Sequence, residues 1–287
     1  MSNIASLVRI PERAAKPTVI ALHCSGATRS EWRQLERDLG HRFTLIAPDL
    51  IGCGGTAHWT GSQAFKLSDE AAQVVRIIDA TKEPVHLVGH SYGGCVALRA
   101  AIERPNQVAS MTLYEPAAFH VLKMMRPDGR SALEAIAALA SSINRFVLNG
   151  DHHAAAKYFI EYWSGEASWP AMRREAQDEI VRYIPKVCLE FSAAIGERVP
   201  HYAYRRFYFP VLLLQGELAP EPAQMIARQL VKAVRLASLQ TVYGAGHMGP
   251  FSHAATVSAM MTDWIMRAEQ RHSKVECDAK FHIDRVA

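Results

Sequence analysis

The segment 89–93, Gly-His-Ser-Tyr-Gly, stands between an apolar run at 84–88 and a helix-forming stretch at 94–101. A serine between two glycines is a weak signal alone, but a strand before it and a helix after it make the pattern specific. The chain must reverse sharply at Ser91, which strains its backbone, and the glycines leave room for strand and helix to cross. We therefore expect Ser91 to be a nucleophile exposed at the top of a sheet.

The composition is that of an ordinary globular protein. The 287 residues are 49% hydrophobic and 21% charged, with a net charge of +4 spread along the chain, which does not indicate nucleic-acid binding. No segment approaches the roughly 20 apolar residues of a membrane span, and the N-terminus lacks the pattern of a signal peptide. The five scattered cysteines form no CxxC pair, so we expect a reduced, cytoplasmic protein without a membrane or nucleic-acid partner.

Two kinds of segment alternate along the chain. Short apolar runs ended by turn residues predict strands buried on both faces at 16–23 and 43–48, and further strands fit 84–88, 108–114, 210–215 and 238–242. Helical spacing predicts helices between them, at 30–39, 68–80, 94–104, 221–235 and 254–270. This alternation predicts an α/β fold with a mainly parallel sheet and right-handed crossovers. The tail after Arg271 is expected to be loosely ordered.

Residues 118–205 interrupt the alternation. They contain no convincing strand but helical stretches at 131–147, 151–163 and 170–183. We interpret them as a helical lid inserted into a core domain formed by 1–117 and 206–287. Most of the lid's aromatic and methionine side chains are expected to pack its own layer, and a few to line a substrate pocket.

A serine nucleophile needs a base, and one of the thirteen histidines stands out. His247 lies in the glycine-rich loop 244–250, between the last strand and the last helix, where the backbone can bring an imidazole to a neighbouring strand end. His90 adjoins Ser91, but neighbours on a sharp turn point apart, so we expect it to pack beside the strand.

An acyl-transfer site also needs donors for the oxyanion. The backbone N–H of Tyr92, directly after the nucleophile, is one expected donor. The N–H of Ser25, in the turn 23–26 after the first strand, is the other.

These motifs occur in the order seen in enzymes of the α/β-hydrolase fold, and the chain resembles that family over residues 16–270. The resemblance is greatest to the lidded esterases, lactonases and C–C hydrolases, and it implies a mainly parallel central sheet flanked by helices with an inserted lid. Two departures stand out. Cys24 replaces the usual glycine of the turn after the first strand, and Ala219 stands where the family usually has its catalytic aspartate.

The acid of the site must therefore lie elsewhere. Glu115 follows the strand 108–114, and Pro116 biases it toward an extended backbone that would aim its side chain from the strand tip. Some relatives of the fold, such as the haloalkane dehalogenases, resemble this placement. Glu217 is the alternative, and the sequence also leaves open that neither glutamate serves. Asp49 resembles the usual turn aspartate of the fold and needs no catalytic role.

The resemblance implies a carboxylesterase-like serine hydrolase that cleaves an ester or related acyl bond of a small molecule. Ser91 would attack, His247 would move the proton, and Glu115 would orient the histidine, with no metal or organic cofactor. A lactonase, thioesterase or C–C bond hydrolase would use the same residues. A non-catalytic ligand-binding protein on the same scaffold is the alternative from another class, and a homodimer is one open alternative for the assembly.

Overall fold

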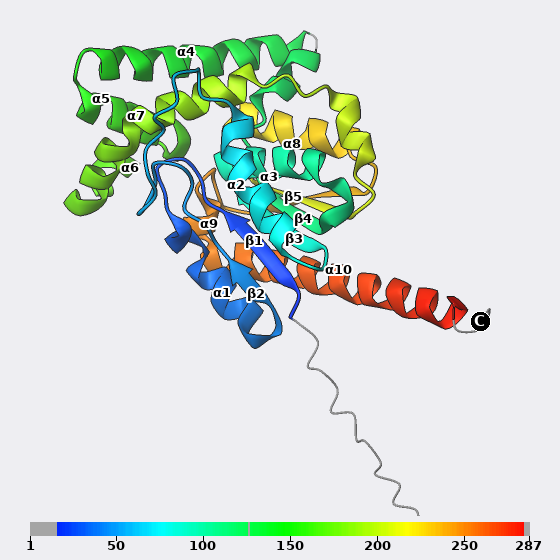
Figure 1. The fold of residues 1–287 in the computed structure, drawn as a ribbon. Coiled ribbons are helices and arrows are strands. Elements are labelled where there is room, and N and C mark those ends of the chain that lie inside the picture. Colours follow the sequence, from blue (N-terminus) through cyan, green and yellow to red (C-terminus); the bar gives the residue numbers. More distant parts are fainter. Residues whose placement is uncertain (1–15, 126, 284–287) are drawn as a thin grey trace, which may run out of the picture.

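The protein is built on a parallel sheet, and the computed structural model describes residues 16–125 and 127–283. Within this part of the chain six strands pair in the order β2-β1-β3-β4-β5-β6 (Figure 1). They are β1 (Thr18–Leu22), β2 (Thr44–Ile46), β3 (Val85–His90), β4 (Val108–Tyr114), β5 (Val211–Gly216) and β6 (Ala237–Val242). Every adjacent pair is parallel, which confirms the predicted fold class.

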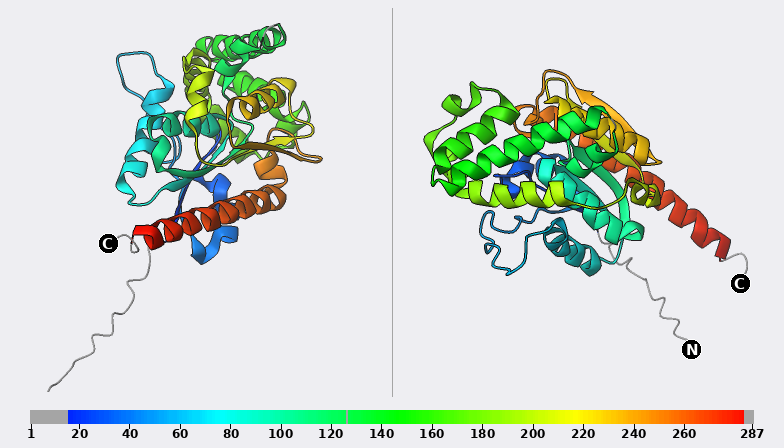
Figure 2. Two further views of the ribbon diagram at one scale, coloured as in Figure 1. Left: turned by 90° about the vertical axis from the view of Figure 1, so that its right-hand side faces the viewer. Right: turned by 90° about the horizontal axis from the view of Figure 1, so that it is seen from above.

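The sheet is covered on both faces. In β1, Ile20 and Leu22 face a core formed with α2 (Leu67–Ala80), α3 (Ser91–Glu103) and α8 (Glu221–Ala233). The alternate residues Val19 and Ala21 face the opposite core, formed with α1 (Arg33–Leu39) and α10 (Ala254–Ile283). Figure 2 shows α1 and α10 on one side of the sheet and α2, α3 and α8 on the other. Burial on both faces explains the mainly apolar sequences of the inner strands β1, β3, β4 and β5. The edge strands β2 and β6 are only partly buried, so the expectation that 43–48 is buried on both faces is wrong.

A helical insertion, residues 119–206, connects β4 to β5. It comprises η4 (Phe119–Met124), α4 (Asp128–Leu148), α5 (His152–Ser164), α6 (Ser168–Ala171), α7 (Arg174–Gly196) and η5 (His201–Arg206). Its helices stack over the α2–α3–α8 side of the sheet (Figure 1). Helix α7 differs from the predicted stretch at 170–183, because it continues through Pro185 for more than two further turns. Packing of its apolar face against the insertion and the core outweighs the hydrogen bond that an interior proline removes.

Two helices differ from expectation. Helix α4 is long and apolar enough, by length and composition alone, to cross a membrane, although no such segment was expected. Its residues Ile136, Leu139 and Ile143 are buried in the core of the insertion, as in a packed amphipathic helix. Helix α10 continues to Ile283, so the tail after Arg271 is helical up to that residue and not irregular. The segment 254–283 contains neither glycine nor proline to end the helix earlier.

The remaining short helices occupy loops: η1 (Arg29–Trp32), η2 (Gly40–Arg42), η3 (Pro105–Gln107) and α9 (Gly249–Ser252). The chain crosses from β2 on one side of β1 to β3 on the other. Ligands of open α/β sheets bind outside the carboxyl ends of the strands at such a reversal. The fold therefore places the end of β3, and with it Ser91, at the expected binding edge.

Candidate active site

Ser91 occupies the sharp turn from β3 into α3. Its φ is 51°, a left-handed conformation that costs energy for a residue with a side chain. A Cβ on Gly89 would lie 2.6 Å from the Cα of Gly94, and one on Gly93 would overlap the carbonyl oxygen of Leu22, so both positions require glycine. The expectation that Ser91 is exposed is wrong, because only 7% of it is accessible under the covering helical insertion.

A chain of hydrogen bonds links Ser91, His247 and Glu115. The Oγ of Ser91 lies 3.0 Å from Nε2 of His247, and Nδ1 of the same ring lies 2.6 Å from Oε2 of Glu115. The residues come from the ends of β3 and β4 and from the loop after β6. A carboxylate accepts from Nδ1–H, which leaves Nε2 free to accept the serine proton. The structure thus brings together three of the predicted site residues in the geometry of a Ser-His-carboxylate triad.

The backbone of Glu115 is not extended, as the following proline suggested, but left-handed with a φ of 41°. Hydrogen bonds from distant segments enforce this conformation. The Glu115 N–H donates to the carbonyl of Leu214 (3.0 Å), and Oε1 accepts from the N–H of Gly216 (2.6 Å). The N–H of Ala117 donates to the carbonyl of Ser91 (2.8 Å), which couples the two strained turns. Ser91 and Glu115 are the two non-glycine residues with positive φ among the described residues.

The alternative acid, Glu217, lies elsewhere. Its side chain is turned toward the loop after β6, where Oε2 accepts a hydrogen bond from the N–H of Gly244 (2.9 Å). Ala219 is buried in the turn after β5. Of the two predicted glutamates, Glu115 is therefore the one in contact with His247.

The turn after β1 lies against the nucleophile. Ser25 and Tyr92 line a cavity of about 20 Å³ together with Ser91. Tyr92 belongs to the first turn of α3, where backbone N–H groups have no partner within the helix. His23 fixes the turn, since its Nε2 accepts from the N–H of Leu50 (3.0 Å) and its Nδ1–H donates to the carbonyl of Cys24 (2.8 Å). Both predicted oxyanion donors thus border the space beside Ser91.

Sequence reasoning missed a second buried histidine–carboxylate pair. Nδ1 of His90 lies 2.7 Å from Oε1 of Glu31, and Oε2 of Glu31 accepts from the N–H of Cys24 (2.9 Å). The N–H at Nε2 of His90 donates to the backbone carbonyl of His247 (2.9 Å). His90 therefore does more than pack beside the strand. Glu31 and His90 are 59 positions apart in the sequence, so no local pattern indicated this pair.

Cys24, Glu31 and His90 lie close enough together to suggest a metal site. Their contacts do not favour one. Both oxygens of Glu31 and both nitrogens of His90 already have protein partners. Burial, reinforced by Glu31, raises the pKa of the Cys24 thiol well above its usual value, whereas a metal ligand must be a thiolate. The group is better described as a hydrogen-bonded support of the site.

His247 is tuned toward its neutral form. Burial lowers its pKa below the usual value, and the hydrogen bond and charge of Glu115 offset only part of that effect. The Trp163 ring from α5 covers the imidazole, with 4.2 Å between ring centroids. A neutral imidazole is the form that can accept the proton of Ser91.

A larger cavity of about 500 Å³ also opens at Ser91 and His247. Its walls come from the turn after β1, from α5 and α7, and from the loop after β6. Of the aromatic residues in the insertion, Phe159, Trp163 and Tyr183 line this cavity, and Phe119 lines the small one. The site therefore has a wide compartment and a narrow one, which meet at the serine.

The comparisons with known proteins agree with this architecture. A sequence model of the Alpha/beta hydrolase family matches residues 19–260. Monoacylglycerol lipase abhd6-B of Xenopus laevis is 26% identical over 69% of this chain, and the matched part spans 54% of that protein. A component of the acetoin cleaving system of Cupriavidus necator, a dihydrolipoyllysine-residue acetyltransferase, is 34% identical over 36% of this chain and 27% of its own length. The chain thus spans at most about half of these relatives.

Solved structures show the same fold. The enol-lactonase from Burkholderia xenovorans superposes with a TM-score of 0.70 at 16% identity, covering 89% of this chain and 93% of the other. A thermophilic esterase from Thermogutta terrifontis superposes with a TM-score of 0.65 at 21% identity, covering 88% and 91%. At such identities the likeness concerns the fold alone.

Proposed function

Since this chain belongs to the alpha/beta hydrolase family, we propose that it is a serine hydrolase that cleaves an ester or related acyl bond of a small molecule. The observation that carries the proposal is the hydrogen-bonded chain from Ser91 through His247 to Glu115. Its placement at the end of a strained strand–helix turn is what nucleophilic acyl transfer requires.

In the proposed reaction Ser91 Oγ forms a bond to the substrate carbonyl carbon while Nε2 of His247 takes the hydroxyl proton. Glu115, held by the N–H of Gly216, stabilises the resulting imidazolium. The N–H groups of Ser25 and Tyr92 stabilise the oxyanion. His247 then protonates the leaving group as its bond to the carbonyl carbon breaks. A water molecule, deprotonated by His247, releases the acid and regenerates the serine, so the mechanism needs no metal or cofactor.

The helical insertion acts in this proposal as a lid. Phe159 and Trp163 of α5 cover Ser91 and line the wide compartment, which suits an apolar group on one side of the scissile bond. Named relatives include a monoacylglycerol lipase and, among structures, an enol-lactonase and an esterase. Carboxylic esters and lactones are therefore the first substrates to test, and thioesters and C–C bonds are alternatives that the same residues could serve.

Labelling with a fluorophosphonate probe tests the proposal directly. The wild-type protein should form a covalent adduct at Ser91, located by mass spectrometry, and should hydrolyse short p-nitrophenyl esters. Ser91→Ala should remain folded and lose both properties, with turnover falling on the order of 10⁴- to 10⁶-fold. An unlabelled wild-type serine would instead favour a ligand-binding protein on the hydrolase scaffold.

A further inference from the structure

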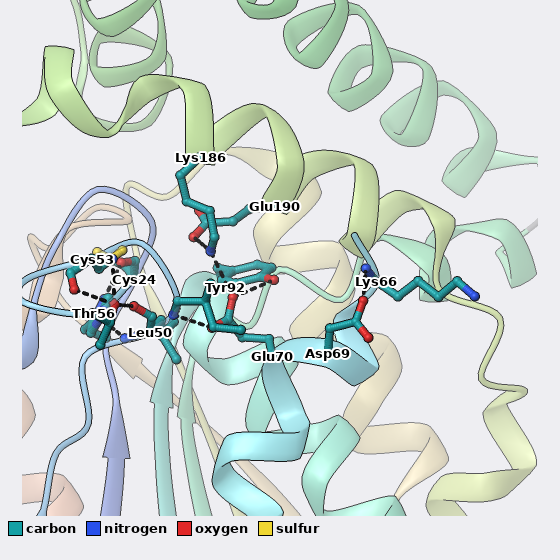
Figure 3. A network of polar contacts seen from close by, with 12 residues as sticks. Cys24, Leu50, Cys53, Thr56, Lys66, Asp69, Glu70, Tyr92, Lys186 and Glu190 are labelled. Carbon is teal, nitrogen blue, oxygen red and sulfur yellow. Dashed lines mark hydrogen bonds and ion pairs between the residues drawn. The ribbon is translucent and has the colours of Figure 1, made fainter. Parts of the chain in front are cut away.

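A buried charged cluster lies between the helical insertion and the core, next to the active site. Lys186 and Glu190 project from α7 onto Glu70 of α2 and Tyr92 of α3 (Figure 3). The Lys186 ammonium donates to Oε2 of Glu70 (2.8 Å) and to Oε1 of Glu190 (2.9 Å). It also lies 5.3 Å from the ring centroid of Tyr92, the residue that follows the nucleophile. These residues are almost fully buried, which is costly for ionised groups unless they are paired.

The cluster contains two carboxyl groups and one ammonium group. Burial alone would lower the pKa of Lys186, but Glu190 and Glu70 raise it well above its usual value, so the lysine is charged. Glu70 is well supplied with donors, because Oε1 accepts from the N–H of Ile51 (2.6 Å) and Oε2 from Lys186 and, at 3.4 Å, from the Tyr92 hydroxyl. Glu190, by contrast, accepts a hydrogen bond from Lys186 alone among the described residues.

One carboxyl oxygen of Glu190 has no hydrogen-bond donor among the described residues. Its Oε1 is bonded to Lys186, whereas Oε2 is buried and has no hydrogen-bond partner in the described part of the chain. The residue is 2% exposed and lines the narrow compartment that also borders Ser91, Ser25 and Tyr92. A buried carboxylate oxygen without a donor costs stability, so such an atom in a native protein needs an explanation.

The narrow compartment limits what can supply the donor. At about 20 Å³ it has room for one water-sized group. Its other walls are apolar, from Ala117, Phe119, Phe159, Phe191 and Ala194 among others. A small group that enters beside the proposed oxyanion donors Ser25 and Tyr92 would therefore meet Glu190 as the one acidic residue of the lining.

We propose that Glu190 is a specificity-determining residue that accepts a hydrogen bond from a hydroxyl or N–H group on a short acyl chain, next to the carbonyl that Ser91 attacks. The inference rests on the proposed hydrolase function. The wide compartment takes the apolar part of the substrate on the other side of the cleaved bond. A second carboxylate on the acyl chain is disfavoured, because it would face Glu190 without a donor.

Three matched esters test this assignment: p-nitrophenyl propionate and its 2-hydroxy and 3-hydroxy analogues, each rate divided by that of spontaneous hydrolysis. Wild-type protein should prefer one hydroxylated ester by about 10- to 100-fold in kcat/KM, the scale of a hydrogen bond to a charged group. Glu190→Leu should reduce the preference to near one, and Glu190→Gln should retain part of it. The exposed Glu175→Gln, on the same helix and outside both compartments, should leave both the preference and the rate unchanged.

The outcomes separate this inference from the proposed function. Hydrolysis without preference, or a preference that survives Glu190→Leu, would mean that a water molecule satisfies Glu190, and would overturn the assignment while leaving the hydrolase intact. If Glu190→Leu fails to fold, the preference of Glu190→Gln is measured instead. A preference equal to that of the wild type would then overturn the assignment. If the wild-type protein hydrolyses no ester, the proposed function is wrong. Binding of the same three esters to Ser91→Ala, measured by ligand-observed NMR, then tests the role of Glu190. Equal binding would overturn it.

Discussion

The imidazoles of His90 and His247 lie side by side, with 5.1 Å between ring centroids, and Nε2 of His90 donates to the backbone carbonyl of His247 at 2.9 Å. The residue next to the nucleophile thus holds the backbone of the proposed base. Glu31 binds the other nitrogen of His90 and also the N–H of Cys24, which precedes the proposed oxyanion donor Ser25. A single carboxylate therefore connects the two loops that must keep their positions relative to Ser91.

Glu31→Gln should lower kcat by about 10- to 100-fold with a smaller change in KM. An amide can keep only part of this network, and small displacements of positioned groups are costly for catalysis. Steady-state kinetics with a p-nitrophenyl ester measures the split, and Glu36→Gln, an exposed glutamate in the following helix, is the control. Wild-type kinetics in a folded Glu31→Gln protein would contradict a positioning role.

Glu115→Gln and Glu217→Gln should differ strongly. The first keeps the shape but removes the charge that stabilises the His247 imidazolium, a change that costs about 10⁴-fold in turnover in a triad. The second affects a side chain bonded to Gly244 and should cost tenfold at most. Turnover of the two purified variants on one ester compares them, and the reverse ranking would assign the acid to Glu217.

The dependence of kcat/KM on pH should report a base with a lowered pKa. Because burial lowers the pKa of His247, the imidazole is neutral at pH 7 and accepts protons only below the usual value of about 6.5. Activity should be flat near neutrality and fall about tenfold per pH unit on the acid side, once the pH is below that lowered pKa. An acid limb centred above 6.5 would be inconsistent with the buried geometry.

Trp163→Ala should move this acid limb to higher pH. The indole covers the His247 ring, so its removal admits water and weakens the desolvation that lowers the pKa of His247. The shift in the pH profile is the measurement, because a purely steric role in substrate binding would change KM without moving the limb. Trp163→Phe, which keeps an apolar cover, should move it less.

The sequence predicts the inner strands to within a few residues because burial on both faces makes them mainly apolar. The sequence is less informative where contacts between distant segments determine the conformation. Pro116 predicted an extended backbone at Glu115, but hydrogen bonds to β5 and to the turn at Ser91 hold that backbone in the left-handed region. Glu31 contacts His90 only in the folded chain. Glu190 lies beyond the predicted helical stretch at 170–183, and its place beside Ser91 depends on contacts between α7 and the core.

The order of the site residues along the chain has a consequence for how such a protein can diverge. Ser91 and Glu115 both precede the helical insertion, on the paired strands β3 and β4, and are joined by the bond from Ala117 to Ser91. Only His247 follows it. Evolution can therefore lengthen, shorten or replace residues 119–206 without separating the proposed nucleophile from the proposed acid. An acid placed after β5 would be separated from Ser91 by the insertion, so each change there could alter its position. In this chain the pocket can change while Ser91 and Glu115 keep their relative positions.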